Sequence, residues 1–142
     1  MTEARDLFEV AVLPVASATD AQTTCAGAAA HLRRAGGRAV VVHVIEGSPP
    51  TDEDEHTEDA EETFAAAREA FGAADIDIET RLEYGEDIPE TVFAVADEVD
   101  ASAIAFTPRA GGRWVKLLSG DLTSVLVSDS DRPVVVLPDR HE

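Results

Sequence analysis

Short apolar segments recur along the chain, and segments of helical length separate them. Four of these segments are almost continuously apolar, which is typical of strands buried on both faces of a sheet. They cover Leu7–Val15, Arg38–Ile45, Ser102–Phe106 and Val134–Leu137. A fifth segment, Ile76–Leu82, alternates apolar and polar residues and predicts a half-exposed edge strand. Strands that alternate with helices indicate an α/β fold with a parallel sheet.

The intervening segments have helical character. Residues 21–34 are rich in alanine and stop at Gly36 and Gly37, and Thr19 or Asp20 is the expected N-cap. The apolar residues of 88–99 fall on one helical face, with Pro89 in the first turn. Residues 121–130 predict the last helix. Together these elements predict one domain over residues 1–142, with an open five-stranded parallel sheet and helices on both faces.

Residues 52–62 contain eight acids, and this run opens a helix that continues to Phe71. We predict a flexible acidic loop over residues 47–57, where Gly47, Ser48, Pro49 and Pro50 interrupt the chain. The run is interpreted as a solvated segment, with a site for a basic partner as the alternative.

The chain has 29 acidic and 11 basic residues, a formal net charge of -18, and Lys116 is its only lysine. Such a surface repels itself in dilute salt, whereas at 1 M salt the Debye length falls to about 3 Å and screens the repulsion. The acids are spread over the whole chain, which favours adaptation to a salt-rich cytoplasm over binding of a basic partner. The same charge argues against nucleic acid and anionic membranes as partners.

Other sequence features limit the choice of function. Cys25 is the only cysteine, so no intramolecular disulfide forms and a cysteine-based metal site is not expected. The N-terminal segment carries three acids and no apolar signal core, and no segment reaches the about 18 apolar residues of a membrane span. We therefore expect a soluble, cytoplasmic protein.

In open parallel sheets, ligands bind outside the carboxyl ends of the strands, where the strand order reverses. Two segments are expected to meet there: residues 14–19 after the first strand and residues 107–123 after the fourth. The second segment contains a glycine loop, TPRAGGRWVKLLSGDLTSVLV, and is followed by the strand PVVVLP.

This closing segment resembles that of the universal stress protein family, and so do VAVLPV, VVHVIEG and YGEDIPETVFAVADEVDASAIAF. The resemblance spans nearly the whole chain. It implies the strand order 3-2-1-4-5, an adenine nucleotide alpha hydrolase-like fold with flavodoxin-like layering, and a homodimer formed through Val134–Leu137. It also implies a regulatory or stress-response module that binds ATP or AMP.

Nucleotide-binding members of the family carry Gly-x2-Gly-x9-Gly-(Ser/Thr), in which glycine amides and a helix N-terminus hold phosphates. Gly120 matches the last glycine, but Thr107 and Ala110 occupy the earlier glycine positions and Asp121 replaces the hydroxyl. Ala16 stands where the family has the aspartate that holds ribose. The nearby Gly111 and Gly112 would compensate through a shifted loop.

The resemblance still implies a site at the matched positions. Pro14, Val15 and Val44 would contact the base, and Thr123 keeps a hydroxyl in the first helical turn. The full set implied is Pro14, Val15, Ala16, Val44, Arg109, Gly111, Gly112, Arg113, Gly120, Asp121, Leu122 and Thr123.

Several alternatives stay open at this stage. Arg109, Arg113 and Lys116 form an anion site, or else Arg109 and Arg113 pair with nearby carboxylates such as Asp121. His43 is interpreted as a core histidine rather than a catalyst, and Trp114 either packs under the glycine loop or at a subunit contact, or stacks on a base. The main rival function is a dimeric interaction module that binds no nucleotide and regulates a partner such as a transporter. A weak ATPase is a third hypothesis, although no general base or metal-ligand set is visible.

Overall fold

The computed structural model describes residues 6–47, 54–72, 76–108 and 122–138. The elements in chain order are β1 (Val10–Val15), α1 (Ala18–Ala35), β2 (Arg38–Glu46), α2 (Asp54–Phe71), β3 (Asp77–Gly85), α3 (Ile88–Val99), β4 (Ala103–Phe106), α5 (Leu122–Asp129) and β5 (Val134–Val136). The strands form one sheet in the order β3-β2-β1-β4-β5, and all neighbouring strands are parallel. The predicted α/β class and strand order are therefore confirmed.

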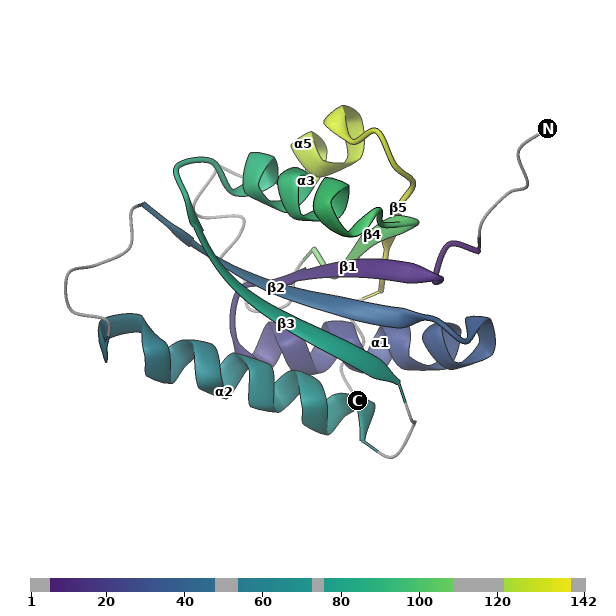
Figure 1. Cartoon of the computed structure of the whole chain (residues 1–142), viewed down its shortest axis with the longest axis horizontal. Helices are drawn as coiled ribbons and strands as arrows, with labels where there is room; N and C mark the ends of the chain where they lie inside the picture. The colour runs from purple at the N-terminus through teal and green to yellow at the C-terminus, as the bar shows by residue number, and fades with distance from the viewer. Residues whose placement is uncertain (1–5, 48–53, 73–75, 109–121, 139–142) are drawn as a thin grey trace.

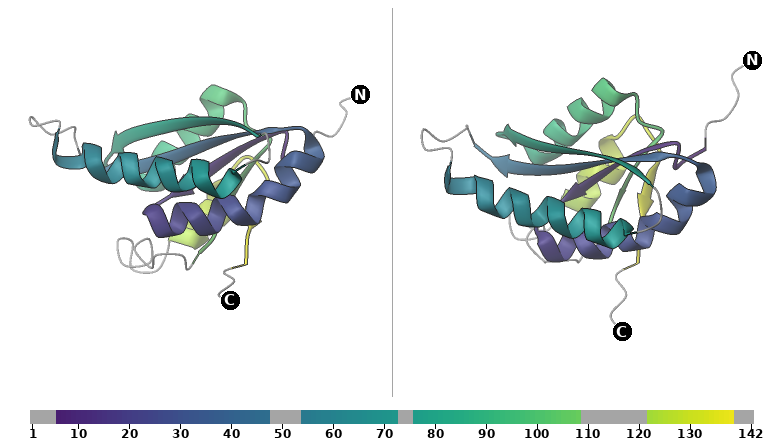
Figure 2. Two further views of the ribbon diagram at one scale, coloured as in Figure 1. Left: turned by 90° about the horizontal axis from the view of Figure 1, so that it is seen from below. Right: turned by 60° about the horizontal axis from the view of Figure 1, so that its bottom comes forward.

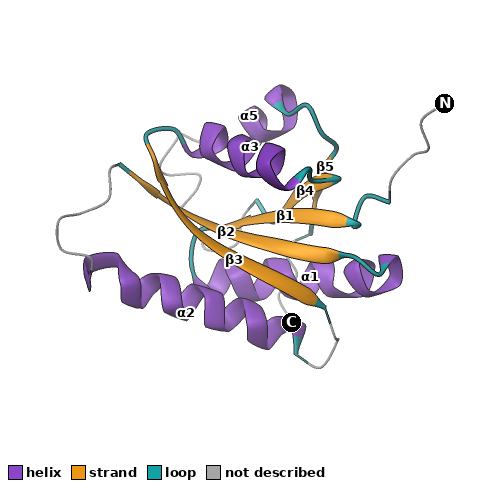
Figure 3. Ribbon diagram, viewed as in Figure 1, coloured by secondary structure: helices purple, strands orange, loops and turns teal. Residues whose placement is uncertain are grey.

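The helices form a layer on each face of this sheet. Helices α1 and α2 lie side by side along one face, and α3 and α5 cover the other (Figures 1 and 2). Figure 3 shows the same arrangement, with the strands between the two helical layers. Right-handed crossovers between parallel strands produce this layering, because successive helices return over the sheet.

Alternation along the central strands divides the core into two halves. Ala11, Leu13 and Val15 of β1 pack with α1 and α2, whereas Val12 packs with α3 and α5. Strand β2 behaves in the same way, with Val41 on the first side and Val42 on the second. The buried residues of these two strands are apolar apart from His43, because both faces of the strands are covered.

The starts of β1 and α1 differ from the prediction. The first strand begins at Val10 rather than Leu7, because Asp6 bends the chain: its Oδ1 accepts from Phe8 N at 3.0 Å, and its carbonyl accepts from Glu9 N at 3.1 Å. The prediction of Thr19 or Asp20 as N-cap was wrong. Helix α1 begins at Ala18, and Ser17 is the cap, with an oxygen that accepts from Asp20 N.

Helix α2 begins at Asp54, so residues 54–57 of the predicted acidic loop are helical. Carboxylates in the first turn stabilise a helix because they lie at the positive end of its dipole. Residues 48–53 of that loop lie outside the described residues. Strand β3 is a half-buried edge strand as predicted, but it extends to Gly85 because it pairs with β2 along its whole length, from Asp77 to Gly85.

The expected glycine stop of α1 is confirmed. Gly36 adopts φ 65° and ψ 30°, the left-handed conformation that glycine adopts without steric cost. At Gly37 a β-carbon would collide with the carbonyl oxygen of Phe8, so the close approach of the chain there requires glycine.

Candidate functional site

The strand order reverses between β1 and β4, which are neighbours at the centre of the sheet. From β1 the chain crosses to β2 on one side, while β4 pairs on the other, through Ala11–Ala103 and Val12–Ile104. Helix α1, which follows β1, and helix α5, which follows β4, lie on opposite faces of the sheet (Figure 1), and open α/β sheets place ligands at such a point. The residues at the carboxyl ends of these two strands are Val15 and Ala16 of the first strand and Phe106 and Thr107 of the fourth.

Hydrogen bonds join these two ends. Thr24 of α1 places its Oγ1 2.9 Å from Oγ1 of Thr107 and 3.2 Å from Oδ1 of Asp20. A hydroxyl carries one proton, so a chain in which Thr107 donates to Thr24 and Thr24 donates to Asp20 satisfies all three groups. The end of β1 is thus linked through Asp20 and Thr24 to Thr107, the first residue of the segment 107–123 that was expected to meet residues 14–19.

Asp20 was a predicted N-cap, but in the structure it is the third residue of α1. Its side chain is 1% exposed, and its Oδ2 accepts from Ala16 N at 2.7 Å. In return, Ser17 Oγ accepts from Asp20 N at 3.1 Å. This is a variant of the capping box, in which the first-turn carboxylate reaches back past the cap to the preceding amide. The spacing Ser-x-x-Asp at residues 17–20 was the signal that could have revealed it.

The three apolar residues implied for the base contact lie at the ends of adjacent strands. Val15 is fully buried against α1 and α2, whereas Val44 is buried on the opposite face with α3. Pro14 precedes Val15 in β1, where it is buried and paired with Val42 of β2. Ala16 is half-buried and contributes only a methyl group.

His43 is buried beside Val15. Its Nδ1 lies 3.1 Å from the carbonyl oxygen of Val15, so the protonated nitrogen donates to that oxygen. The ring also packs edge-on against Phe64 of α2, with ring centroids 6.5 Å apart. These contacts support the interpretation as a core histidine that fixes the end of β1 against β2.

The remaining residues implied by the resemblance are not placed. Arg109, Gly111, Gly112, Arg113, Gly120 and Asp121 lie outside the described residues, as do Trp114 and Lys116. Helix α5 begins at Leu122, directly after this segment, but the side chains of Leu122 and Thr123 are not described.

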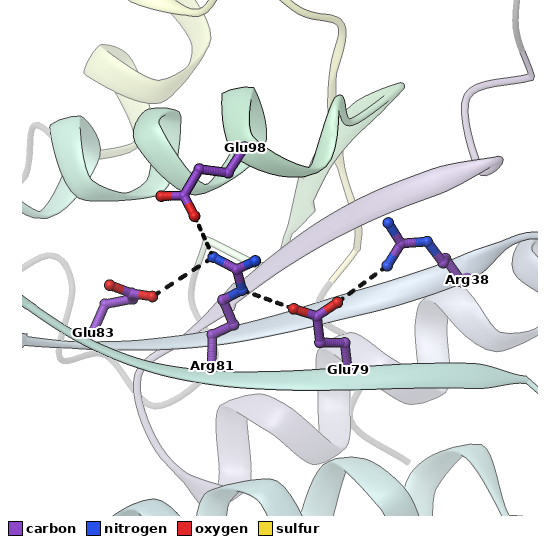
Figure 4. A network of polar contacts seen from close by, with 5 residues as sticks. All are labelled: Arg38, Glu79, Arg81, Glu83 and Glu98. Carbon is purple, nitrogen blue, oxygen red and sulfur yellow. Dashed lines mark hydrogen bonds and ion pairs between the residues drawn. The ribbon is translucent and has the colours of Figure 1, made fainter.

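A separate polar network lies on β3, away from the β1–β4 junction (Figure 4). Arg81 contacts Glu79 at 2.8 Å, Glu98 of α3 at 2.8 Å and Glu83 at 3.9 Å, and Arg38 contacts Glu79 at 3.3 Å. The hydrogen bond from Arg81 lowers the pKa of Glu79 below its ordinary value of 4.5, with help from the charges of both arginines. These ion pairs link the edge strand β3 to β2 and to α3.

Among the described residues, other chemistry is sparse. Burial, together with the charge of Asp20, raises the pKa of the Cys25 thiol to about 12, which keeps this cysteine neutral and unreactive. No group of three or more histidine, cysteine or acidic side chains in the described part of the chain is arranged to hold a metal ion. No described helix is both long and apolar enough to cross a membrane.

Comparison with known proteins decides the family. The model of the universal stress protein family matches residues 8–138. The chain belongs to this family. A search of curated proteins found no match.

Solved universal stress proteins share the fold. One from Archaeoglobus fulgidus is 27% identical, with a TM-score of 0.72 over 90% of this chain and 92% of that one. A structure from the same organism in complex with dAMP is 25% identical, with a TM-score of 0.70 over 90% and 95% of the two chains. One from Burkholderia pseudomallei is 19% identical, with a TM-score of 0.71 over 93% and 97%.

Proposed function

We propose that this universal stress protein is a regulatory stress-response module that binds an adenine nucleotide, AMP or ATP, at the carboxyl ends of β1 and β4. The observation that carries the proposal is the similar Archaeoglobus fulgidus protein, which was solved in complex with dAMP. The junction of β1 and β4 supports it, because this is where open parallel sheets bind ligands.

The proposed contacts follow the strand ends. Because Val15 and Val44 are buried on opposite faces of the sheet, their backbone groups rather than their side chains would face the base. Gly111, Gly112, Gly120 and Thr123 would contribute amide or hydroxyl donors to the phosphates, and Arg109 or Arg113 would offset the charge of Asp121.

Thermal unfolding in concentrated salt, with and without AMP or ATP, tests this proposal. A ligand that binds only the native state stabilises it by about 2.7 kcal/mol at a hundredfold excess over Kd. We expect the midpoint to rise with nucleotide and to remain unchanged with ribose 5-phosphate at the same concentration. An unchanged midpoint with millimolar nucleotide would contradict the proposal.

That outcome would favour the second candidate, a dimeric interaction module that regulates a protein partner without binding nucleotide. The presence of Ala16 and Asp121 at two positions of the family's binding pattern is the observation in its favour.

We also propose that the protein works as a homodimer in a salt-rich cytoplasm. The strand β5 closes one edge of the sheet with Val134–Val136, and Val136 is 49% exposed. A short, apolar and uncharged edge strand is suited to pairing with a second copy, whereas charged side chains protect the other edge, β3.

A further inference from the structure

The register that pairs β1 with β4 stops before β1 ends. Its pairs are Ala11–Ala103 and Val12–Ile104. The register of β1 with β2, in contrast, continues to Val15. Paired strands keep a spacing of about 4.8 Å through their hydrogen bonds. Beyond Val12, the separation of β1 from β4 therefore depends on other contacts as well.

A chain of buried side chains joins the two strand ends. Asp20 of α1 accepts from the Ala16 amide at 2.7 Å, and its other carboxylate oxygen lies 3.2 Å from the hydroxyl of Thr24. The Thr24 hydroxyl lies 2.9 Å from that of Thr107, the residue after β4. Asp20, Thr24 and Thr107 are 1%, 0% and 3% exposed, so the chain lies inside the protein, between β1 and β4.

The alternation of β4 directs Thr107 toward α1. Ala105 packs in the half of the core that contains α1, whereas Phe106 packs in the other half. Because side chains alternate between the faces of a strand, Thr107 returns to the α1 side, where its hydroxyl meets Thr24. Glycine, which the family's nucleotide-binding pattern has at this position, has no side chain to make this bond.

Both hydroxyls depend on their partners in this chain. A buried hydroxyl that loses its partner keeps the cost of desolvation without the bond that offsets it. A hydrogen bond between two oxygens holds them about 3 Å apart, so the chain favours one separation of the two strand ends. A site bordered by both ends needs its groups held within about 0.5 Å of the productive geometry.

We infer that Thr24 and Thr107 are positioning residues of the nucleotide site. Their hydroxyls, bonded to Asp20, fix the distance between the ends of β1 and β4, and this distance sets the affinity for the nucleotide. Neither side chain is assigned a contact with the ligand. The inference rests on the proposed nucleotide binding and adds the residues that give the site its width.

Isothermal titration of AMP into the full chain and its variants, in one concentrated-salt buffer, tests the inference. Thr24→Val and Thr107→Val each remove a hydroxyl at nearly constant shape. Each should raise the Kd for AMP about fivefold, the factor that corresponds to one net hydrogen bond. The double variant should raise the Kd no further than a single variant does, because both substitutions break the same chain. Thr107→Ser keeps the hydroxyl and should stay within about twofold of the wild type.

Thr63→Val is the matched control. Thr63 is 2% exposed, and its hydroxyl donates to the carbonyl of Asp59 at 2.8 Å, within α2. This variant also loses a buried hydrogen bond, but we expect it to bind AMP with the Kd of the wild type. The comparison separates positioning of the strand ends from a general loss of stability.

The outcomes are distinct. Wild-type Kd values in both Thr24→Val and Thr107→Val would overturn the inference while nucleotide binding stands. An equal rise in Thr63→Val would also overturn it, because affinity would then follow stability rather than the junction. Where circular dichroism shows that a valine variant does not fold, the alanine variant at that position replaces it. Absence of AMP binding by the wild-type chain would overturn the proposed function itself.

Discussion

At the scale of single residues, the junction of β1 and β4 is organised by two short side chains. Ser17 and Asp20 both accept hydrogen bonds at the start of α1. The Ser17 hydroxyl accepts from the Asp20 amide, and the Asp20 carboxylate accepts from the Ala16 amide. Asp20 then links to Thr24 and Thr107, which ties the helix to the end of β4. The site therefore takes its shape from the helix start as much as from the strands.

This arrangement predicts the effect of removing the cap. Ser17→Ala should lower the free energy of unfolding by about 1 kcal/mol, because one amide at the start of α1 loses its acceptor. Ser128→Ala, at an exposed position near the end of α5, serves as the matched control and should cost much less. Urea unfolding measures both variants. Equal stability of Ser17→Ala and the wild type would contradict the capping role.

Sequence reasoning predicted the strands that border this junction. It placed Pro14, Val15 and Val44 in strands, because continuous apolar runs indicate where buried strands lie, whereas their contact with a base stays a prediction. It misplaced the cap because serine, threonine and aspartate all favour that position, and only the backbone geometry decides among them. The Thr24–Thr107 contact joins residues 83 apart in the chain and leaves no local signal.

At the scale of elements, the two edges of the sheet are built differently. On β3, Glu79, Arg81 and Glu83 form a charged network with Glu98 of α3, whereas β5 presents valines. Alternation predicted the half-exposed character of β3, but the extension of this strand to Gly85 depends on pairing with β2, which a local pattern does not contain. Element types were therefore more predictable than their ends.

The β3 network predicts a pH effect. Because the folded-state pKa of Glu79 lies below 4.5, its contribution is fully present above that pH and is lost as pH falls through the lowered pKa. Arg81→Gln should thus cost about 1 kcal/mol near pH 7, as expected for exposed ion pairs, and less below pH 4.5. Chemical unfolding at a series of pH values and constant salt measures this.

Arg68→Gln is the control for the β3 network. It removes the same charge, but the described partner of Arg68 is the hydroxyl of Thr80 at 3.3 Å. Its cost should not depend on pH in this range. A cost of Arg81→Gln that stays constant from neutral to acidic pH would contradict the account.

The β5 edge predicts how the proposed homodimer responds to a charge. Val136→Lys should convert a dimer into a monomer, because an edge lysine disfavours strand pairing. Val127→Lys, at an equally exposed valine on α5, should leave the dimer intact. Light scattering after gel filtration measures the mass of each. A Val136→Lys dimer as stable as the wild type would exclude β5 as the contact.

At the scale of the whole molecule, the formal net charge of -18 is the property from which we predict how stability depends on salt. The sequence gives this charge directly, and periodicity predicted the parallel α/β class. The strand order came from the family resemblance, because alternation of strands and helices is compatible with several orders. The path of residues 109–121 could not be derived from local patterns, since a glycine-containing loop has no periodicity.

The charge predicts that the unfolding midpoint falls as KCl is diluted, because screening of like charges weakens. Replacing Glu58, Glu61 and Glu62, which are exposed on α2, by glutamine should reduce this dependence. Replacing the exposed Thr19, Gln22 and Ser128 by alanine changes no charge and should leave the salt dependence as it is. A midpoint independent of KCl would contradict adaptation to salt.

The central claim is that an adenine nucleotide binds at the carboxyl ends of β1 and β4. Amide NMR spectra of the 15N-labelled chain, recorded during titration with AMP, test it most directly. We predict saturable shifts of the Ala16, Ser17 and Thr107 amides, with the amides of α2 unaffected. Shifts confined to other elements, or unchanged spectra at millimolar AMP, would contradict the account.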